Sequence, residues 1–256
     1  MISPHAIIEE GAQIGKDVTI GPHAFVSKDA VIEDGCTIMQ GAIIDGKTRI
    51  GAGTKVFYHA VVGSIPQDLK YKGEEVELII GKNNTIREFC LINPGTEGGG
   101  GKTVIGDNNL LMGYVHVAHD CKIGNGCILA NAATLAGHVE LGDNVVIGGM
   151  TPIHQFVHIG DYAMIAGASA VSQDIPPYCL AEGNRAKLRG LNLTGIRRRL
   201  GSEVVNELKA AYKELFLSGK PLQESAKKLL ESSSEHVKKL AKFVLETKRG
   251  IPYRGA

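Results

Sequence analysis

Histidine is concentrated in one stretch of this sequence. Five of the nine histidines lie between residues 115 and 159, at His116, His119, His138, His154 and His158. An imidazole has an ordinary pKa of about 6.5 and accepts a proton at neutral pH, so a cluster of this kind is typical of general-base chemistry. Asp120 directly follows His119 and carries a carboxylate that could orient a ring. We interpret the four histidines outside this stretch as residues without a chemical role.

The secondary structure that must position these residues is indicated by a repeat of six residues. An aliphatic residue recurs at every sixth position from Ile8 to Val62, from Ile80 to Ile92 and from Ile105 to Val171. A period of six is neither the 3.6 of a helix nor the 2 of one long strand, and it predicts short strands joined by corners. Glycine often follows the aliphatic residue, where we expect the backbone of the corner to take unusual angles.

Three hexads should close one coil of a parallel β-helix, so that each residue stacks on the residue 18 positions later in the sequence. Neighbouring coils are then one strand spacing apart, about 4.8 Å. On this count His119 and Asp120 lie against Gly137 and His138 of the next coil. The alternative is that solenoid corners tolerate polar side chains, and that the histidines do no chemistry.

Interruptions of the repeat divide the chain. Residues about 64–78 carry charges where aliphatic residues belong, and residues about 97–104 are rich in glycine, so both should form excursion loops. The repeat ends at Pro176 and Pro177, which cannot continue a β-ladder. Apolar residues at helical spacing follow from about Ser202. We therefore expect a β-helix over residues 1–178 and a small α-helical domain over residues 179–256.

Metal and thiol chemistry are disfavoured by spacing. The near histidine pairs are three and four residues apart, which differs from the zinc-binding repeat proteins of the carbonic-anhydrase type. Four cysteines occupy the small position of their hexads, namely Cys36, Cys90, Cys121 and Cys127, and Cys179 lies past the repeats. We predict neither a metal nor a thiol nucleophile.

Charge and composition exclude several classes of protein. Lys and Arg total 28 against 27 Asp and Glu, a net charge of +1, so no global field favours nucleic acid. No apolar run approaches the ~18 residues of a membrane span, and the first ten residues do not resemble a secretory signal. Five cysteines without paired spacing indicate a reducing compartment, and we expect a cytoplasmic protein. The basic segment 185–199 is either a solvated face or a site for phosphate or an acidic protein.

Longer motifs follow one another in a specific order. They are Ile65–Tyr71 (IPQDLKY), Asn109–Met112 (NLLM), Val117–Asp120 (VAHD), Cys127–His138 (CILANAATLAGH), Ile147–Phe156 (IGGMTPIHQF), Asp174–Tyr178 (DIPPY), Glu182–Ala186 (EGNRA) and Gly190–Asn192 (GLN). In this order, and over essentially the whole chain, they closely resemble the UDP-N-acetylglucosamine acyltransferases that begin lipid A synthesis.

The resemblance implies a mainly β fold, a left-handed parallel β-helix of hexapeptide repeats followed by a small C-terminal α-helical domain. It also implies a homotrimer with active sites between subunits. The implied reaction is transfer of a (R)-3-hydroxyacyl chain from acyl carrier protein to the glucosamine 3-hydroxyl of UDP-N-acetylglucosamine. It implies no cofactor besides the phosphopantetheine of the carrier protein, and no metal.

The resemblance also assigns site residues. His119 is implied as the general base, Asp120 as its support and Gly137 as the backbone donor to the oxyanion. The implied substrate-binding residues are Gln67, Asp68, Lys70, His116, His138, His154, Gln155, Asn192, Arg198 and Arg199. Gly167 matches a position that limits acyl-chain length, and glycine there predicts a groove for a longer chain.

Three other interpretations remain. A sister N-acyltransferase of the same pathway shares the fold and the donor, but it usually has an extra N-terminal uridine-binding domain, whereas the repeats here start at Ile8. A non-catalytic scaffold would leave the histidine cluster without a purpose. The repeat tail of a nucleotidyltransferase would need a nucleotide-binding domain before the repeats.

Overall fold

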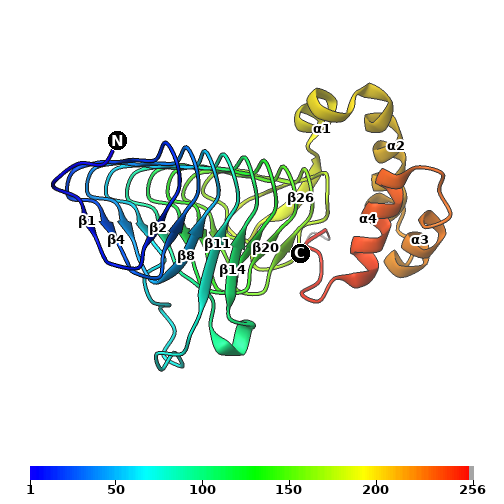
Figure 1. Cartoon of the computed structure of the whole chain (residues 1–256). Helices are drawn as coiled ribbons and strands as arrows, with labels where there is room; N and C mark the ends of the chain where they lie inside the picture. Colours follow the sequence, from blue (N-terminus) through cyan, green and yellow to red (C-terminus); the bar gives the residue numbers. More distant parts are fainter. Residues whose placement is uncertain (254–256) are drawn as a thin grey trace.

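The computed structural model describes residues 1–253 as a long coil of short strands with helices at its C-terminal end (Figure 1). The strands form three sheets, and as far as β24 every third strand along the chain joins the same sheet. Sheet 1 contains β1 (Ile7–Ile8), β4 (Phe25–Val26), β7 (Ile43–Ile44), β10 (Val61–Val62), β13 (Leu91–Ile92), β16 (His116–Val117), β19 (Thr134–Leu135) and β22 (Pro152–Ile153). Sheet 2 contains β2 (Gln13–Ile14), β5 (Val31–Ile32), β8 (Lys47–Ile50), β11 (Glu77–Ile80), β14 (Lys102–Ile105), β17 (Lys122–Ile123), β20 (Glu140–Leu141) and β23 (His158–Ile159). Sheet 3 contains β3 (Thr19–Ile20), β6 (Thr37–Ile38), β9 (Lys55–Val56), β12 (Thr85–Ile86), β15 (Leu110–Leu111), β18 (Ile128–Leu129), β21 (Val146–Ile147), β24 (Met164–Ile165), β25 (Cys179–Glu182) and β26 (Lys187–Leu191).

The register between coils confirms the predicted stacking of residues 18 positions apart. Strand β18 pairs in parallel with β21, with Leu129 opposite Ile147. Both side chains are fully buried, because the second residue of each short strand points into the coil. At the N-terminal end Ile8 and Ile14 are only half-buried, since no earlier coil covers them. The prediction of a mainly β fold of hexapeptide repeats followed by C-terminal helices is therefore confirmed.

Glycine follows the aliphatic residue for a reason other than the one expected. A Cβ atom at Gly124 would lie 2.6 Å from the Asp143 Oδ1 atom and 2.7 Å from the backbone of Gly142. The positive φ of this corner falls two residues later, at Gly126, with a φ of 65°. The expectation of unusual backbone angles at the first glycine is thus wrong. Glycine is required there because the backbone of the next coil approaches too closely for a side chain.

The two excursion loops project on the same side of the coil (Figure 1). The first leaves sheet 1 after Val62 and returns at Glu77, and the second leaves after Ile92 and returns at Lys102. The predicted limits of about 64–78 and 97–104 therefore shift by a few residues. Glu77 and Lys102 are charged residues inside strands, because their side chains point outward and pair with each other at 3.1 Å.

The chain past the prolines first extends the coil. Leu180 and Ala181 pair in parallel with the last regular strand, β24, and the β25–β26 hairpin caps sheet 3. Residues 179–191, which we assigned to the helical domain, therefore belong to the coil as a hairpin, because Ala181 completes the buried column over Ile165. The helices are α1 (Leu193–Leu200), α2 (Ser202–Tyr212), a π-helical turn (Lys213–Leu217), α3 (Leu222–Leu229) and α4 (Glu235–Glu246). None of the helices in the described part of the chain has the length and apolar character to cross a bilayer.

Buried polar contacts fix the helices to the coil. The Asp174 Oδ2 atom accepts hydrogen bonds from the Thr247 hydroxyl and from the backbone N–H groups of Lys248 and Arg249. The Tyr178 hydroxyl lies 3.0 Å from the Nδ1 atom of His236 on α4. The C-terminal segment is thereby held against the last coil.

Replacing Ile123 by Asp should unfold the coil locally or entirely. Ile123 is 3% exposed and stacks between Ile105 and Leu141, so a carboxylate there would be buried without a partner. We expect a loss of several kcal/mol in the free energy of unfolding, measured by denaturant titration. Lys122→Gln, on the outward side of the same strand, should cost less than about 1 kcal/mol. Equal stability of the two variants would contradict the inward assignment.

Candidate active site

The histidine cluster lies at the corner between sheets 1 and 2. His119 and Asp120 follow β16, and Gly137 and His138 follow β19 on the next coil. The predicted stacking is confirmed, because the His138 N–H donates to the His119 carbonyl at 3.0 Å. Asp120 and His138 both have a φ of 61°, a backbone conformation that turns the chain sharply at this corner.

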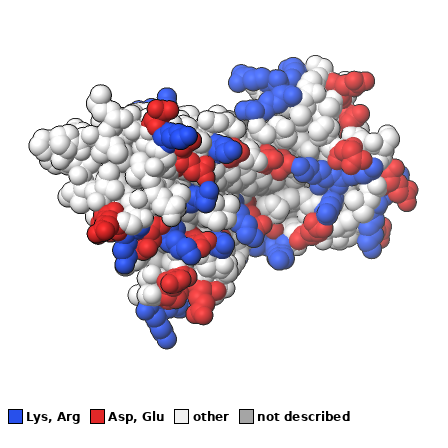
Figure 2. All heavy atoms as spheres, viewed as in Figure 1, with Lys and Arg blue, Asp and Glu red and all other residues white. Residues whose placement is uncertain are grey.

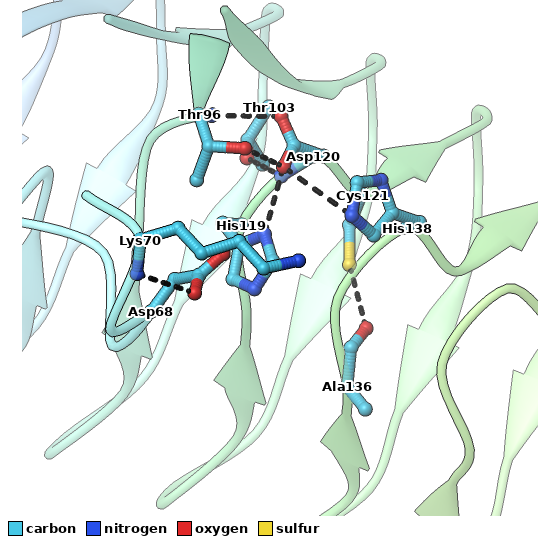
Figure 3. A network of polar contacts seen from close by, with 9 residues as sticks. All are labelled: Asp68, Lys70, Thr96, Thr103, His119, Asp120, Cys121, Ala136 and His138. Carbon is cyan, nitrogen blue, oxygen red and sulfur yellow. Dashed lines mark hydrogen bonds and ion pairs between the residues drawn. The ribbon is translucent and has the colours of Figure 1, made fainter. Parts of the chain in front are cut away.

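The Asp120 carboxylate is the centre of the polar network in Figure 3. Its side chain is 1% exposed. The Oδ1 atom accepts the Thr96 N–H at 2.8 Å, and the Oδ2 atom accepts the Thr96 hydroxyl at 2.7 Å. The Asp120 N–H itself donates to the Thr103 hydroxyl oxygen at 2.8 Å. These bonds offset the cost of burying a charge and fix the plane of the carboxylate.

The imidazole of His119 is oriented by that carboxylate. Its Nδ1 atom lies 2.7 Å from Asp120 Oδ2. A carboxylate only accepts hydrogen bonds, so the Nδ1–H donates and the Nε2 atom keeps its lone pair. Figure 3 shows the second ring nitrogen on the side where Asp68 and Lys70 lie. The geometry is that of a base held in one tautomer.

Gly137 makes room for the His119 ring. A Cβ atom at position 137 would lie 2.6 Å from the Cε1 atom and 2.8 Å from the Nε2 atom of His119. The backbone bonds between coils pass over this residue, since Ala136 donates to Ile153 and His138 donates to His119. The Gly137 N–H therefore has no backbone acceptor in the part of the chain that the structure describes.

Two further histidines of the cluster have pKa values that burial lowers. The His138 ring meets His119 edge-on at 5.2 Å and stacks on Phe156 at 4.4 Å, and burial lowers its pKa. His116, on β16, has its Nδ1 atom 3.0 Å from the Leu91 carbonyl oxygen, and burial lowers its pKa too. Because burial disfavours the charged form, both rings favour the neutral state at pH 7.

The first excursion supplies polar groups to the same corner. Asp68 and Lys70 lie beside His119 in Figure 3, where Asp68 Oδ1 accepts the Lys70 N–H at 3.0 Å. Both charges act on His138, the carboxylate raising its pKa and the ammonium lowering it. Gln67 is exposed on the same loop. His154 and Gln155, one coil beyond Gly137, are also exposed.

Other predicted site residues lie away from this corner within one chain. Asn192 is buried at the start of α1, where its side chain accepts the Gly195 N–H and donates to the Tyr162 carbonyl. Arg198 and Arg199 are exposed in the last turn of α1, where Figure 2 shows basic side chains gathered. Gly167 is exposed at the corner between sheets 3 and 1. No hydrogen bond or ion pair within residues 1–253 joins these four residues to His119.

Three further residues contact Asp120 or His138 without a signal in the sequence, namely Thr96, Thr103 and Phe156. Thr96 lies in the second excursion, and the extra residues of this loop mean that its partner Asp120 cannot be found by counting 18 positions along the sequence. A metal ion would take its ligands from His119, Asp120 and His138, whose donor atoms lie within 4.8 Å of one another. Two of these three residues are already engaged with each other, because Asp120 accepts hydrogen bonds from Thr96 and from the His119 ring. The prediction of no metal stays a prediction.

The coil and its histidine corner place the chain among the hexapeptide-repeat acyltransferases. A family model described as bacterial transferase hexapeptide (six repeats) matches residues 102–137. A second, described as UDP N-acetylglucosamine O-acyltransferase, domain 2, matches residues 174–252.

Relatives and solved structures of the whole chain make the family specific. The acyl-[acyl-carrier-protein]–UDP-N-acetylglucosamine O-acyltransferase of Aliarcobacter butzleri is 62% identical over 97% of this chain and 96% of its own. The enzyme of that name from Sulfurimonas denitrificans is 67% identical over 98% and 97%. The structure of the UDP-N-acetylglucosamine acyltransferase from Campylobacter jejuni matches with a TM-score of 0.96 and 59% identity over the full length of both chains. The Arabidopsis enzyme matches with a TM-score of 0.86 and 38% identity, over 98% of this chain and 100% of its own. The chain belongs to the family of UDP-N-acetylglucosamine O-acyltransferases.

Gly137→Ala should displace the His119 ring. The added Cβ would lie within 3 Å of two ring atoms, and the stacked coils leave the backbone little freedom to move away. We expect acyl transfer to fall at least tenfold, the usual scale for a misplaced catalytic group. The rate is measured per folded protein, with circular dichroism reporting the folded fraction. Unchanged turnover in the folded variant would show that the ring does not need its present position.

Proposed function

We propose that this chain transfers a (R)-3-hydroxyacyl group from acyl carrier protein to the 3-hydroxyl of UDP-N-acetylglucosamine, the first step of lipid A biosynthesis, with His119 as the general base. The observation that carries the proposal is the His119–Asp120 pair, with Nδ1 bonded at 2.7 Å and Nε2 left to accept a proton. Family membership supports the choice of substrates, since relatives more than 60% identical bear the name of this reaction.

The proposed transfer proceeds by one proton relay. His119 Nε2 removes the proton of the sugar 3-hydroxyl as the oxygen attacks the thioester carbon. The tetrahedral intermediate carries its negative charge on the former carbonyl oxygen, and the Gly137 N–H donates to it. The C–S bond then breaks, and the phosphopantetheine sulfur leaves with the proton from Nε2. Asp120 stabilises the imidazolium formed between the two proton transfers, and no metal or redox group takes part.

The surrounding side chains suit a nucleotide sugar. Asp68 and Lys70 can form hydrogen bonds and ion pairs with a substrate near His119. His116 and His138, which favour the neutral state, can donate or accept hydrogen bonds without competing for the proton of the sugar hydroxyl. We assign substrate binding to Gln67, Asp68, Lys70, His116, His138, His154, Gln155, Asn192, Arg198 and Arg199. The arginines suit a diphosphate because their forked donors match phosphate oxygens. The side chain of Asn192 already caps α1, so its contact with the nucleotide would need that cap to be shared.

We further propose a homotrimer with its sites between subunits. Two of the sheets each carry a run of apolar side chains that face outward and are half-buried or exposed. They are Leu110, Ile128, Val146, Met164 and Leu180 on sheet 3, and Ile7, Phe25, Ile43, Val61 and Leu91 on sheet 1. Sheet 2 instead carries outward ion pairs such as Lys122 with Glu140. Burying sheets 1 and 3 against neighbours would leave sheet 2 in water.

The same arrangement would complete the site. His119 lies at the edge of sheet 1, so a neighbour packed on that sheet would bring its own α1 arginines or acyl groove to the corner. We also infer that the coil is left-handed, as the family resemblance implies. The cytoplasmic location and the absence of a bound cofactor stay predictions.

His119→Ala should abolish most acyl transfer. Loss of a general base costs roughly 10²- to 10⁴-fold in rate. The assay incubates UDP-N-acetylglucosamine with (R)-3-hydroxyacyl carrier-protein thioesters and reads the product by mass. Cleavage of the product by mild alkali identifies an ester, whereas the amide of an N-acyltransferase would resist. His5→Ala is the matched control, because His5 is exposed at the far N-terminal end. Full turnover by His119→Ala, in a preparation that light scattering shows to have the mass of a trimer, would contradict the mechanism.

Gly167→Met should shorten the preferred acyl chain. A Cβ at position 167 makes only ordinary contact, 3.4 Å from the Gly149 carbonyl oxygen, so the variant should fold normally. The larger side chain would occupy the end of the proposed groove. Competition among thioesters of graded length, with products resolved by mass, reports the preference. An unchanged length profile would show that residue 167 does not bound the groove.

A further inference from the structure

The second excursion, residues 93–101, makes its hydrogen bonds to Asp120 through one residue, Thr96. Thr96 uses its N–H on the Oδ1 atom and its hydroxyl on the Oδ2 atom. Thr96 is 6% exposed, so water does not replace these donors readily. The hydroxyl shares Oδ2 with the His119 Nδ1–H, and the position of the acceptor thus decides the direction of the ring.

The turn that follows Thr96 covers the same carboxylate. A Cβ atom at Gly99 would lie 2.0 Å from the Asp120 Cγ atom and 2.2 and 2.3 Å from its two oxygens. Gly99 therefore lies flat on the carboxylate group. At the neighbouring Gly98 an added Cβ would meet nothing within 4 Å. The two glycines belong to one 3₁₀ turn, Glu97–Gly99, and differ in this respect.

The turn is closed on itself and tied to the first excursion. The Thr96 carbonyl accepts the Gly99 N–H at 3.0 Å and the Gly101 N–H at 2.7 Å. At the base of the loop the buried Asn93 side chain donates to the carbonyls of Ser64 and Ile65, at 3.0 and 3.2 Å. The excursion that holds Asp120 is thereby bonded to the loop that carries Asp68 and Lys70.

We propose that Thr96 is a positioning residue for acyl transfer, and that Gly99 lets the turn seal the carboxylate it holds. Both residues act through Asp120 on the direction and tautomer of the His119 ring, and neither touches substrate. The inference rests on the proposed role of His119. The proposal predicts a loss in kcat that is larger than any change in KM, because among the assigned binding side chains it is His138, with its Nε2 atom 3.7 Å from Asp120 Oδ2, that faces the same carboxylate.

The glycine pair gives the first test. Gly99→Ala should lower kcat at least tenfold with KM changed less than about threefold, because the methyl group must push the carboxylate away from the ring. Gly98→Ala is the matched control and should keep the activity of the natural chain. Equal kcat for the two variants overturns the proposal.

The hydroxyl gives the second test. Thr96→Val keeps the shape but removes the donor, and kcat should fall roughly 10- to 100-fold, the worth of one hydrogen bond to a charged acceptor. Thr96→Ser restores the donor and should recover most of kcat. A purely structural role would lower the folded fraction of Thr96→Val and leave its kcat per folded protein unchanged.

A double variant separates this inference from the proposed function. In a His119→Ala background, Thr96→Val should cost no further activity, because its effect passes through the missing ring. An equal further loss there, or unchanged kcat in Thr96→Val alone, overturns the positioning role while the His119 mechanism stands. Full activity of His119→Ala contradicts both the His119 mechanism and the positioning role of Thr96. If Thr96→Val folds poorly, the Gly99 and Gly98 variants decide the question.

Discussion

The parallel stacking of one coil on the next is the constraint on which this molecule depends. Residues 18 positions apart lie one strand spacing apart, so each inward aliphatic side chain is covered by its successor, as Leu129 is by Ile147. The same stacking removes the space for a side chain where the next coil comes closest, as at Gly124 and Gly137. Stability and site geometry therefore share one cause, since neither layer can shift without its neighbours.

The candidate active site is the place where this regular stacking meets an irregular loop. The coil alone brings His119 against Gly137 and His138. A carboxylate at the same corner would be costly to bury, and the hydroxyl and N–H of Thr96 offset that cost from outside the repeat. A carboxylate is thus kept beside an imidazole with little water around it, a setting in which its electrostatic effect is large.

Particular residues show how far the sequence alone leads. The count of 18 predicted that His119 stacks on Gly137, and the structure confirms it, because the coils from β16 to β23 follow the repeat without insertions. The charged residues of β11 indicated a loop although Glu77 lies in a strand, since an outward position of a β-helix accepts either polarity. The basic segment around Arg198 left two interpretations open, because exposed arginines in the last turn of α1 fit a solvated face and a phosphate site equally well.

The sequence by itself determined the repeating coil, its inward columns, the histidine corner and the family, because all of these are carried by local periodicity and by contiguous motifs. Only the tertiary structure decided that Thr96 holds Asp120 and that Gly99 covers it. The second excursion stretches the spacing between paired strands, so that Leu91 lies opposite His116 instead of a residue 18 positions on. A loop of irregular length has no period, and its contacts are set by how the chain closes in space.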